Sequence, residues 1–114
     1  MRHRKKRTLR GSRDRRRKEL RALASALILY EYIETTSARA KLTKSKVEKL
    51  VTCGKKGDLN ARRKLLRDLS RNAANKVMEV WAPKYQARGG GYTRMTKVGL
   101  YKDGTKKVRL EFVK

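Results

Sequence analysis

Residues 93–101, TRMTKVGLY, and residues 106–113, KKVRLEFV, flank the four residues KDGT (102–105). Both runs are rich in side chains that favour β-strands, and the Asp-Gly pair between them is typical of a hairpin turn. The preceding sequence shows helical periodicity instead. This stretch therefore predicts a C-terminal β-hairpin, and it decides the fold class.

The hairpin has two alternative registers. A two-residue loop at residues 103–104 places Gly99 opposite Val108, whereas a three-residue loop at residues 102–104, with its glycine left-handed in a bulge, places Val98 opposite Val108. We predict the second register, because it pairs two apolar side chains on one face of the sheet.

A third strand is expected because an isolated hairpin is only marginally stable in water. The residues 32–35, YIET, mix polar and β-favouring side chains and are the best candidate. The predicted fold is α+β, with about four helices packed on a small three-stranded sheet.

Four helical segments precede the hairpin. Apolar side chains at three- and four-residue steps, together with candidate N-caps and breaks, place them at about 14–30, 37–55, 59–69 and 73–81. Thr36 or Ser37 is the expected N-cap of the second helix and Asp58 that of the third. We expect Pro83 to stop the fourth helix.

Apolar residues on these helices are assigned to the core. The third helix is expected to contribute Leu59, Leu66 and Leu69. The fourth is expected to contribute Ala73, Val77, Val80 and Trp81, with Trp81 as a core residue and not as a platform for stacking bases.

Charge is the strongest indication of function. The 114 residues contain 34 Lys and Arg against 10 Asp and Glu, a formal net charge of +24. A phosphate backbone would relieve the self-repulsion of such a chain and gain entropy by releasing its counterions, so nucleic acid is the expected partner.

The chain is predicted to consist of a basic RNA-binding tail, residues 1–12, and one α+β domain, residues 13–114. The tail is too charged and too poor in apolar side chains to fold alone, so we expect it to be disordered until it binds RNA. The predicted RNA-binding residues at this end of the chain are Arg2, His3, Arg4, Lys5, Lys6, Arg7, Arg10, Arg13, Arg15, Arg16 and Arg17.

A second predicted RNA contact is the segment before the hairpin. Missing side chains let a glycine backbone approach a phosphate, flanking arginines supply charge, and a tyrosine can stack on a base or donate a hydrogen bond. The residues concerned are Arg88, Gly89, Gly90, Gly91, Tyr92, Thr93 and Arg94. The alternative is a plain flexible linker.

Catalysis and cofactor binding are not expected. His3 lies in the basic tail, Cys53 is expected to be a small buried side chain, and the carboxylates form no evident acid–base pair. We therefore predict a protein that is not an enzyme, with no metal, cofactor or small-molecule substrate. No apolar run approaches the about 20 residues of a membrane span, and we find no targeting signal, so a cytoplasmic protein without a membrane partner is expected.

Three short motifs carry a resemblance to a known family. The start MRHRK (1–5), the pattern E-x-I-x-T-T (31–36) with Ala40-Lys41 downstream, and GGYTR (90–94) together resemble the bacterial large-subunit ribosomal protein seventeen family in order and spacing. Each motif alone is weak. The sequence departs from the family pattern at Ser37-Ala38, where Leu-Pro is common.

The resemblance implies a structural constituent of the ribosome that binds 23S ribosomal RNA near the exit of the peptide tunnel. Neighbouring large-subunit ribosomal proteins are then further partners, and the location is the cytoplasmic ribosome. The residues alone support a less specific function, and a DNA-binding nucleoid-type protein remains the alternative. An enzyme acting on RNA is disfavoured by the missing acid–base groups.

Overall fold

The order of helices and strands confirms the predicted fold class. The structure, a computed structural model, describes residues 11–113. Its elements are α1 (Arg13–Tyr30), β1 (Tyr32–Thr36), α2 (Ser37–Gly54), α3 (Leu59–Asp68), α4 (Arg71–Lys76), the π-helical turn η1 (Val77–Trp81), α5 (Ala82–Lys84), β2 (Thr93–Leu100) and β3 (Lys106–Phe112). Since α4, η1 and α5 are continuous, the described residues form four helical segments and three strands. The strands make one antiparallel sheet in the order β1-β3-β2.

Each of the four helical segments begins at a residue whose side chain caps it. Ser12, Thr36, Asp58 and Ser70 each accept a hydrogen bond from the backbone amide three residues further on. Such a bond satisfies one of the amides that has no partner within the helix. The predicted caps at Thr36 and Asp58 are thereby confirmed.

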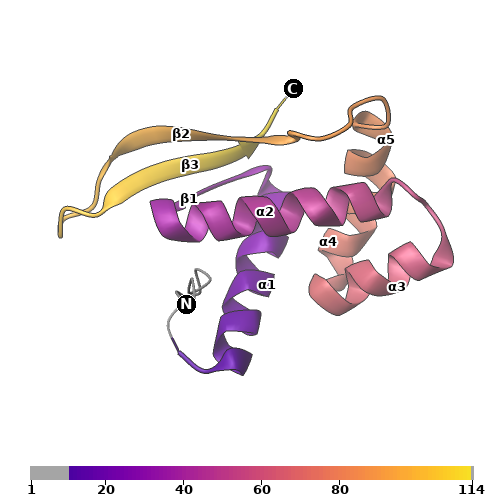
Figure 1. Cartoon of the computed structure of the whole chain (residues 1–114), viewed down its shortest axis with the longest axis horizontal. Coiled ribbons are helices and arrows are strands. Elements are labelled where there is room, and N and C mark those ends of the chain that lie inside the picture. Colours follow the sequence, from indigo (N-terminus) through magenta and orange to yellow (C-terminus); the bar gives the residue numbers. More distant parts are fainter. Residues whose placement is uncertain (1–10, 114) are drawn as a thin grey trace, which may run out of the picture.

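The core lies between the sheet and the helices. α2 runs along one face of the sheet, and α1 passes across α2 on the side away from the sheet (Figure 1). Trp81 is 2% exposed, and its indole Nε1 donates a 3.1 Å hydrogen bond to the carbonyl of Ile28 at the end of α1. The Trp81 ring stacks on Phe112 of β3 with centroids 3.9 Å apart. Trp81 is therefore a core residue, as predicted.

The turn of the hairpin follows the predicted three-residue loop. Tyr101 donates its backbone amide to the carbonyl of Thr105 at 2.8 Å, and Gly104 has a φ of +86°. Leu100 pairs with Lys106 directly beside this loop. The turn end of the hairpin extends past the start of α2 (Figure 1).

Further from the turn the predicted register is wrong. Val98 forms a bulge that shifts the pairing by one residue, so Lys97 and not Val98 lies opposite Val108. The shift turns Met95 toward the core, at a position that an unbroken register would give to Thr96. The bulge therefore exchanges a polar for an apolar side chain against the helices.

Two predicted core residues of α3 are exposed. Leu59 is 62% exposed and Leu66 is 37% exposed, whereas Ala61, Leu65 and Leu69 are buried. Ala61 and Leu65 lie one turn apart on the same face of α3, and Leu69 follows directly after the end of the helix. The two exposed leucines lie on other faces.

The last helical segment departs from α-helical geometry at η1. The amide of Ala82 donates to the carbonyl of Val77, five residues earlier, and the prediction that Val80 lies in the core is wrong because its side chain is 43% exposed. Pro83 does not stop the helix at once, since α5 continues through it to Lys84, but the segment ends there, within one turn of the proline. Cys53 is only half-buried, with Sγ 3.9 Å from the carbonyl oxygen of Ala61.

Candidate nucleic-acid interface

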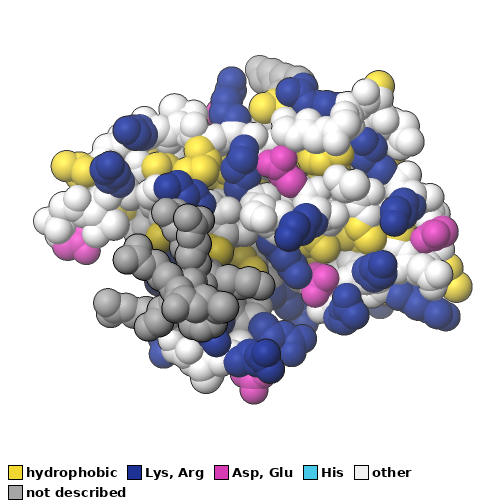
Figure 2. Space-filling view, viewed as in Figure 1, with side chains coloured by type: hydrophobic (Ala, Val, Ile, Leu, Met, Phe, Trp, Pro, Cys, Tyr) yellow, Lys and Arg dark blue, Asp and Glu magenta, His cyan; other side chains and the backbone are white. Residues whose placement is uncertain are grey.

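Cationic side chains are spread over the surface, and few of them are neutralised within the chain. Figure 2 shows Lys and Arg side chains over the helices and the hairpin alike, with separate acidic side chains between them. Within residues 11–113, seven Lys or Arg side chains form ion pairs with carboxylates. Most Lys and Arg in this part of the chain therefore remain available to an external anion.

The predicted arginines at the start of α1 project mostly into solvent. Arg13, Arg15 and Arg17 are exposed. Arg16 is partly buried, and its Nε has no hydrogen-bond partner among residues 11–113. The predicted contacts Arg2, His3, Arg4, Lys5, Lys6, Arg7 and Arg10 lie outside the described residues, as does the predicted disorder of the tail.

The glycine segment is fixed at its ends by one stripe of α2. Glu48 accepts hydrogen bonds from the amide of Gly91 and from the hydroxyl of Thr93, both at 3.1 Å. Lys55, two helical turns further along, donates to the carbonyl of Arg88 and, at 3.2 Å, to the hydroxyl of Tyr92. The segment is therefore attached to the domain at both ends and is not a plain linker.

The middle of this segment is open. Apart from the glycine itself and its chain neighbours, no atom of the described residues lies within 4 Å of the position that a Cβ would take at Gly89, Gly90 or Gly91. Gly91 has a φ of +64°, in the left-handed region that favours glycine. Arg88 folds back so that its Nε donates to the carbonyl of Gly90 at 3.2 Å. The exposed glycine backbone and one guanidinium group thus share a small area of surface.

Tyr92 and Thr93 contribute to the core with their side chains. Tyr92 has no exposed surface, its ring centroid lies 5.2 Å from that of Tyr85, and its hydroxyl lies 3.1 Å from the hydroxyl of Thr52. The expectation that this ring stacks on a base is therefore corrected, since the core already covers it. Arg94 is exposed, but its Nη2 donates to Glu111 at 3.2 Å on the outer side of the sheet.

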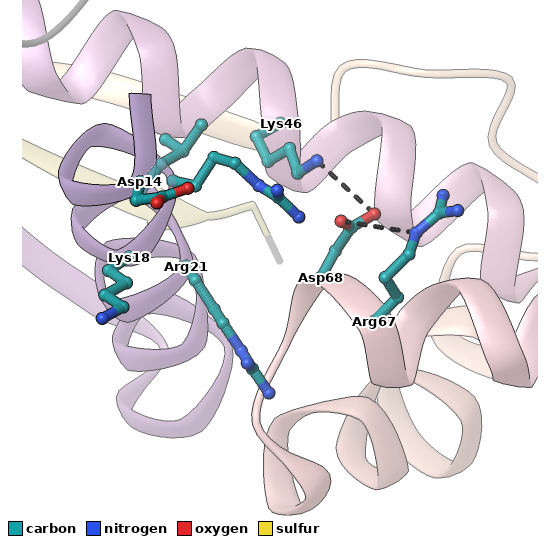
Figure 3. Close-up of a pocket in the computed structure, with 8 residues that line it drawn as sticks. Asp14, Lys18, Arg21, Lys46, Arg67 and Asp68 are labelled. Atoms are coloured by element: carbon teal, nitrogen blue, oxygen red, sulfur yellow. Dashed lines mark ion pairs between the residues drawn. The ribbon is translucent and has the colours of Figure 1, made fainter. Parts of the chain in front are cut away.

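The two predicted contact regions lie apart. The start of α1 and the segment between α5 and β2 occupy different ends of the molecule in Figure 1. The structure instead brings Arg17 of the first region together with cations from other helices around a pocket (Figure 3). The cations that the sequence did not single out there are Lys18, Arg21, Lys46 and Arg67. Arg17 and Arg21 are four residues apart, so the sequence alone could show that they share one face of a helix. That this face lies beside Lys46 of α2 and Arg67 of α3 depends on tertiary packing.

Other kinds of site find little support in the described part of the chain. Residues 11–113 contain no group of three His, Cys, Asp or Glu side chains arranged to hold a metal ion. Within the same range, none of the helices combines the length and apolar character needed to span a membrane. The surface groups that remain are cations and exposed backbone, which bind anions by charge and hydrogen bonding.

Comparison with known proteins identifies the family. The family described as ribosomal protein L17 matches residues 19–113. The chain belongs to the ribosomal protein L17 family. This is a family of ribosomal structural proteins and not of enzymes, in agreement with the prediction from the sequence.

Individual relatives cover most of the chain. The large ribosomal subunit protein bL17 of Staphylococcus epidermidis is 47% identical over 112 residues, spanning 88% of this chain and 92% of that protein. The bL17 protein of Clostridium botulinum strain Loch Maree is 45% identical over 102 residues, with 88% and 90% covered. That of Thermodesulfovibrio yellowstonii is 46% identical, with 88% and 77% covered. The similarity thus extends over the helices and the sheet together.

Proposed function

We propose that this protein is a structural constituent of the bacterial large ribosomal subunit that binds 23S ribosomal RNA. The observation that carries the proposal is the excess of unpaired cations, because seven ion pairs leave most of the Lys and Arg within residues 11–113 without an acidic partner. A polyanion supplies the missing charge. The relatives' names, large ribosomal subunit protein bL17, support the large subunit as the assembly.

The proposal assigns different contacts to different parts of the chain. Residues 1–12 act as a basic RNA-binding tail, residues 13–114 form one domain, and the open backbone of Gly89 and Gly90 receives a phosphate beside Arg88. Phosphate contacts of this kind position a protein on RNA without reading sequence. Location in the cytoplasmic ribosome near the tunnel exit, beside other large-subunit proteins, is part of the same proposal and follows the family resemblance.

Salt dependence tests the binding mode. If about eight phosphates are contacted, log K for 23S RNA should fall with log salt with a slope of roughly −6 to −7. Filter binding at a series of potassium chloride concentrations measures the slope. An affinity that hardly changes with salt would contradict a phosphate-based interface.

Sedimentation tests the assembly. In a lysate with magnesium, a tagged full-length chain should travel with the large subunit through a sucrose gradient. Cosedimentation with DNA, lost after nuclease treatment specific for DNA, would instead favour a nucleoid protein. Deleting residues 1–10 should weaken RNA binding without lowering the free energy of unfolding of the domain, because the cap of α1 at Ser12 is kept.

A further inference from the structure

A pocket between α1, α2 and the end of α3 gathers cations from three helices. Its volume is about 280 Å³. The lining residues are Asp14, Arg17, Lys18, Leu20, Arg21, Lys46, Arg67 and Asp68. They include five cations, two carboxylates and no aromatic side chain. The pocket therefore carries an excess of positive charge and has no platform on which a base could stack.

The cations differ in how they are held. In Figure 3, Lys46 of α2 and Arg67 of α3 point toward Asp68, with N–O distances of 3.4 Å and 4.0 Å. Arg21 of α1 reaches the same end of α3, where its Nη2 donates to the carbonyl of Leu69 at 2.9 Å. One carboxylate and one carbonyl thus orient three of the five cations before any ligand arrives.

The other cations of the pocket have no such partner. Arg17 and Lys18 form no ion pair with any residue in the range 11–113. Arg17 and Lys18 lie one helical turn from Arg21 and Asp14, so one face of α1 presents its charges to the pocket. These two side chains are available to a ligand without breaking an existing ion pair.

We propose that this pocket binds a backbone phosphate of RNA, a specific contact that rests on the proposed RNA-binding function. A phosphate matches the charge of the site, and a guanidinium group binds its oxygens with two parallel hydrogen bonds. The chain's own residues 1–10 are an unsuitable occupant, because they contain six Lys or Arg and no Asp or Glu. A second copy of the chain, with a net charge of +24, is equally unsuitable.

Asp68 has two opposing effects on phosphate binding in this pocket. Its carboxylate orients Lys46 and Arg67, but it also repels a phosphate that approaches the same two cations. Replacing Asp68 by Asn should therefore strengthen binding of inorganic phosphate, measured with the full chain. If the ion pairs of Asp68 only stabilise the fold, neither the parent nor Asp68→Asn should bind phosphate at this pocket.

The central experiment compares two double variants that remove the same charges from the same helices. Lys46→Gln with Arg67→Gln removes two cations of the pocket. Lys49→Gln with Arg63→Gln removes two exposed cations of α2 and α3 that do not line it. Affinity for 23S RNA should fall about tenfold or more in the pocket variant relative to its control, and the salt slope should become shallower by about 1. Urea unfolding establishes that both variants are folded.

Each outcome has a defined meaning. Equal losses in the two variants, with the parent binding RNA, would overturn the pocket proposal and leave the proposed function standing. A parent that fails to bind 23S RNA would overturn the proposed function itself. NMR signals of the arginine side chains, titrated with inorganic phosphate, distinguish the source of the phosphate. Inorganic phosphate could shift the NMR signals of the pocket arginines while the two double variants bind RNA equally well. That result would show an anion site that RNA does not use, and would overturn the assignment to RNA.

Discussion

The carboxylate of Glu48 on α2 holds the amide of Gly91 at 3.1 Å, 43 residues further along the chain. The same carboxylate binds the hydroxyl of Thr93, and Lys44 lies 3.5 Å from it. One acidic side chain thus fixes the position at which the glycine segment enters β2. This attachment separates the structural part of the segment, at Gly91, from the open part at Gly90.

The first prediction uses this separation. Gly91→Ala should lower the free energy of unfolding by about 1–2 kcal/mol, because alanine is strained at a φ of +64°. Gly90→Ala should change stability by less than about 0.5 kcal/mol, since no atom lies within 4 Å of the added methyl group. Its affinity for RNA should nevertheless fall, because the methyl group obstructs backbone approach. Urea unfolding and filter binding measure both effects, and unchanged RNA binding by Gly90→Ala would refute the contact.

The second prediction concerns close packing at Gly54. A Cβ at this position would lie 2.7 Å from Cγ1 of Val77 and 3.5 Å from Cδ1 of Leu65. Gly54→Ala should therefore destabilise the fold by about 1–3 kcal/mol, despite the higher helix propensity of alanine. The double variant Gly54→Ala with Val77→Ala should be more stable than the sum of the single effects predicts. Additive losses in urea unfolding would mean that the two positions do not compete for space.

The third prediction concerns stability at alkaline pH. Burial raises the pKa of the Tyr85 hydroxyl, an effect that Arg88 partly opposes and Glu31 reinforces. Below about pH 10 the folded and unfolded chains both keep this proton, whereas above it the unfolded chain loses the proton first. The contribution of Tyr85 to stability should therefore be complete below about pH 10 and disappear as pH rises through the folded-state pKa.

Tyr85→Phe isolates this effect. The variant loses the hydrogen bond to the carbonyl of Val113 and about 1 kcal/mol at neutral pH. Its stability should then fall less steeply than that of the parent above pH 10. Tyr30→Phe, at a side chain that is 71% exposed, serves as the control for the loss of a tyrosine hydroxyl outside the core. Parallel urea-unfolding curves for Tyr85→Phe and the parent between pH 9 and 11 would exclude the proposed linkage.

The fourth prediction tests the bulged register. Val108 is 3% exposed and faces the helices, whereas Val98 is 44% exposed within the bulge. Val108→Asp should lower the free energy of unfolding by several kcal/mol, because it buries a charge without a partner. Val98→Asp should lower it by less than about 1 kcal/mol. Similar losses in urea unfolding would indicate that the two side chains share a face after all.

Local features of the fold were predictable from the sequence. The caps at Thr36 and Asp58 and the glycine turn at Gly104 depend on interactions within a few residues, so the local sequence is sufficient to place them. The strand at residues 32–36 was also predictable, because a two-stranded hairpin needs further cover.

Features that depend on tertiary packing were not predictable. The bulge at Val98 places Met95 against the core; Gly99 beside it, with a φ of +149°, is a local sign of a bulge, but it does not tell which side chain the core receives. Similarly, the burial of Tyr92 depends on α2 and on Tyr85, which lie elsewhere in the sequence. The pocket between α1, α2 and α3 is lined by cations that lie up to 50 positions apart in the sequence. The sequence shows their charge but not that they lie around one pocket.

The π-helical turn has a consequence for insertions and deletions. Buried side chains at Ala73, Val77, Trp81 and Tyr85 recur every four residues, a longer repeat than the 3.6 residues of an α-helix. The bond from Ala82 to Val77 accommodates one extra residue and keeps both halves of the segment facing the core. Deleting the exposed Glu79 would remove this extra residue and no core atom, so a regular α-helix could form with Val77 and Trp81 three residues apart and still on one face. At this point of the chain, one residue more or less changes the type of helical turn and leaves the same face against the core.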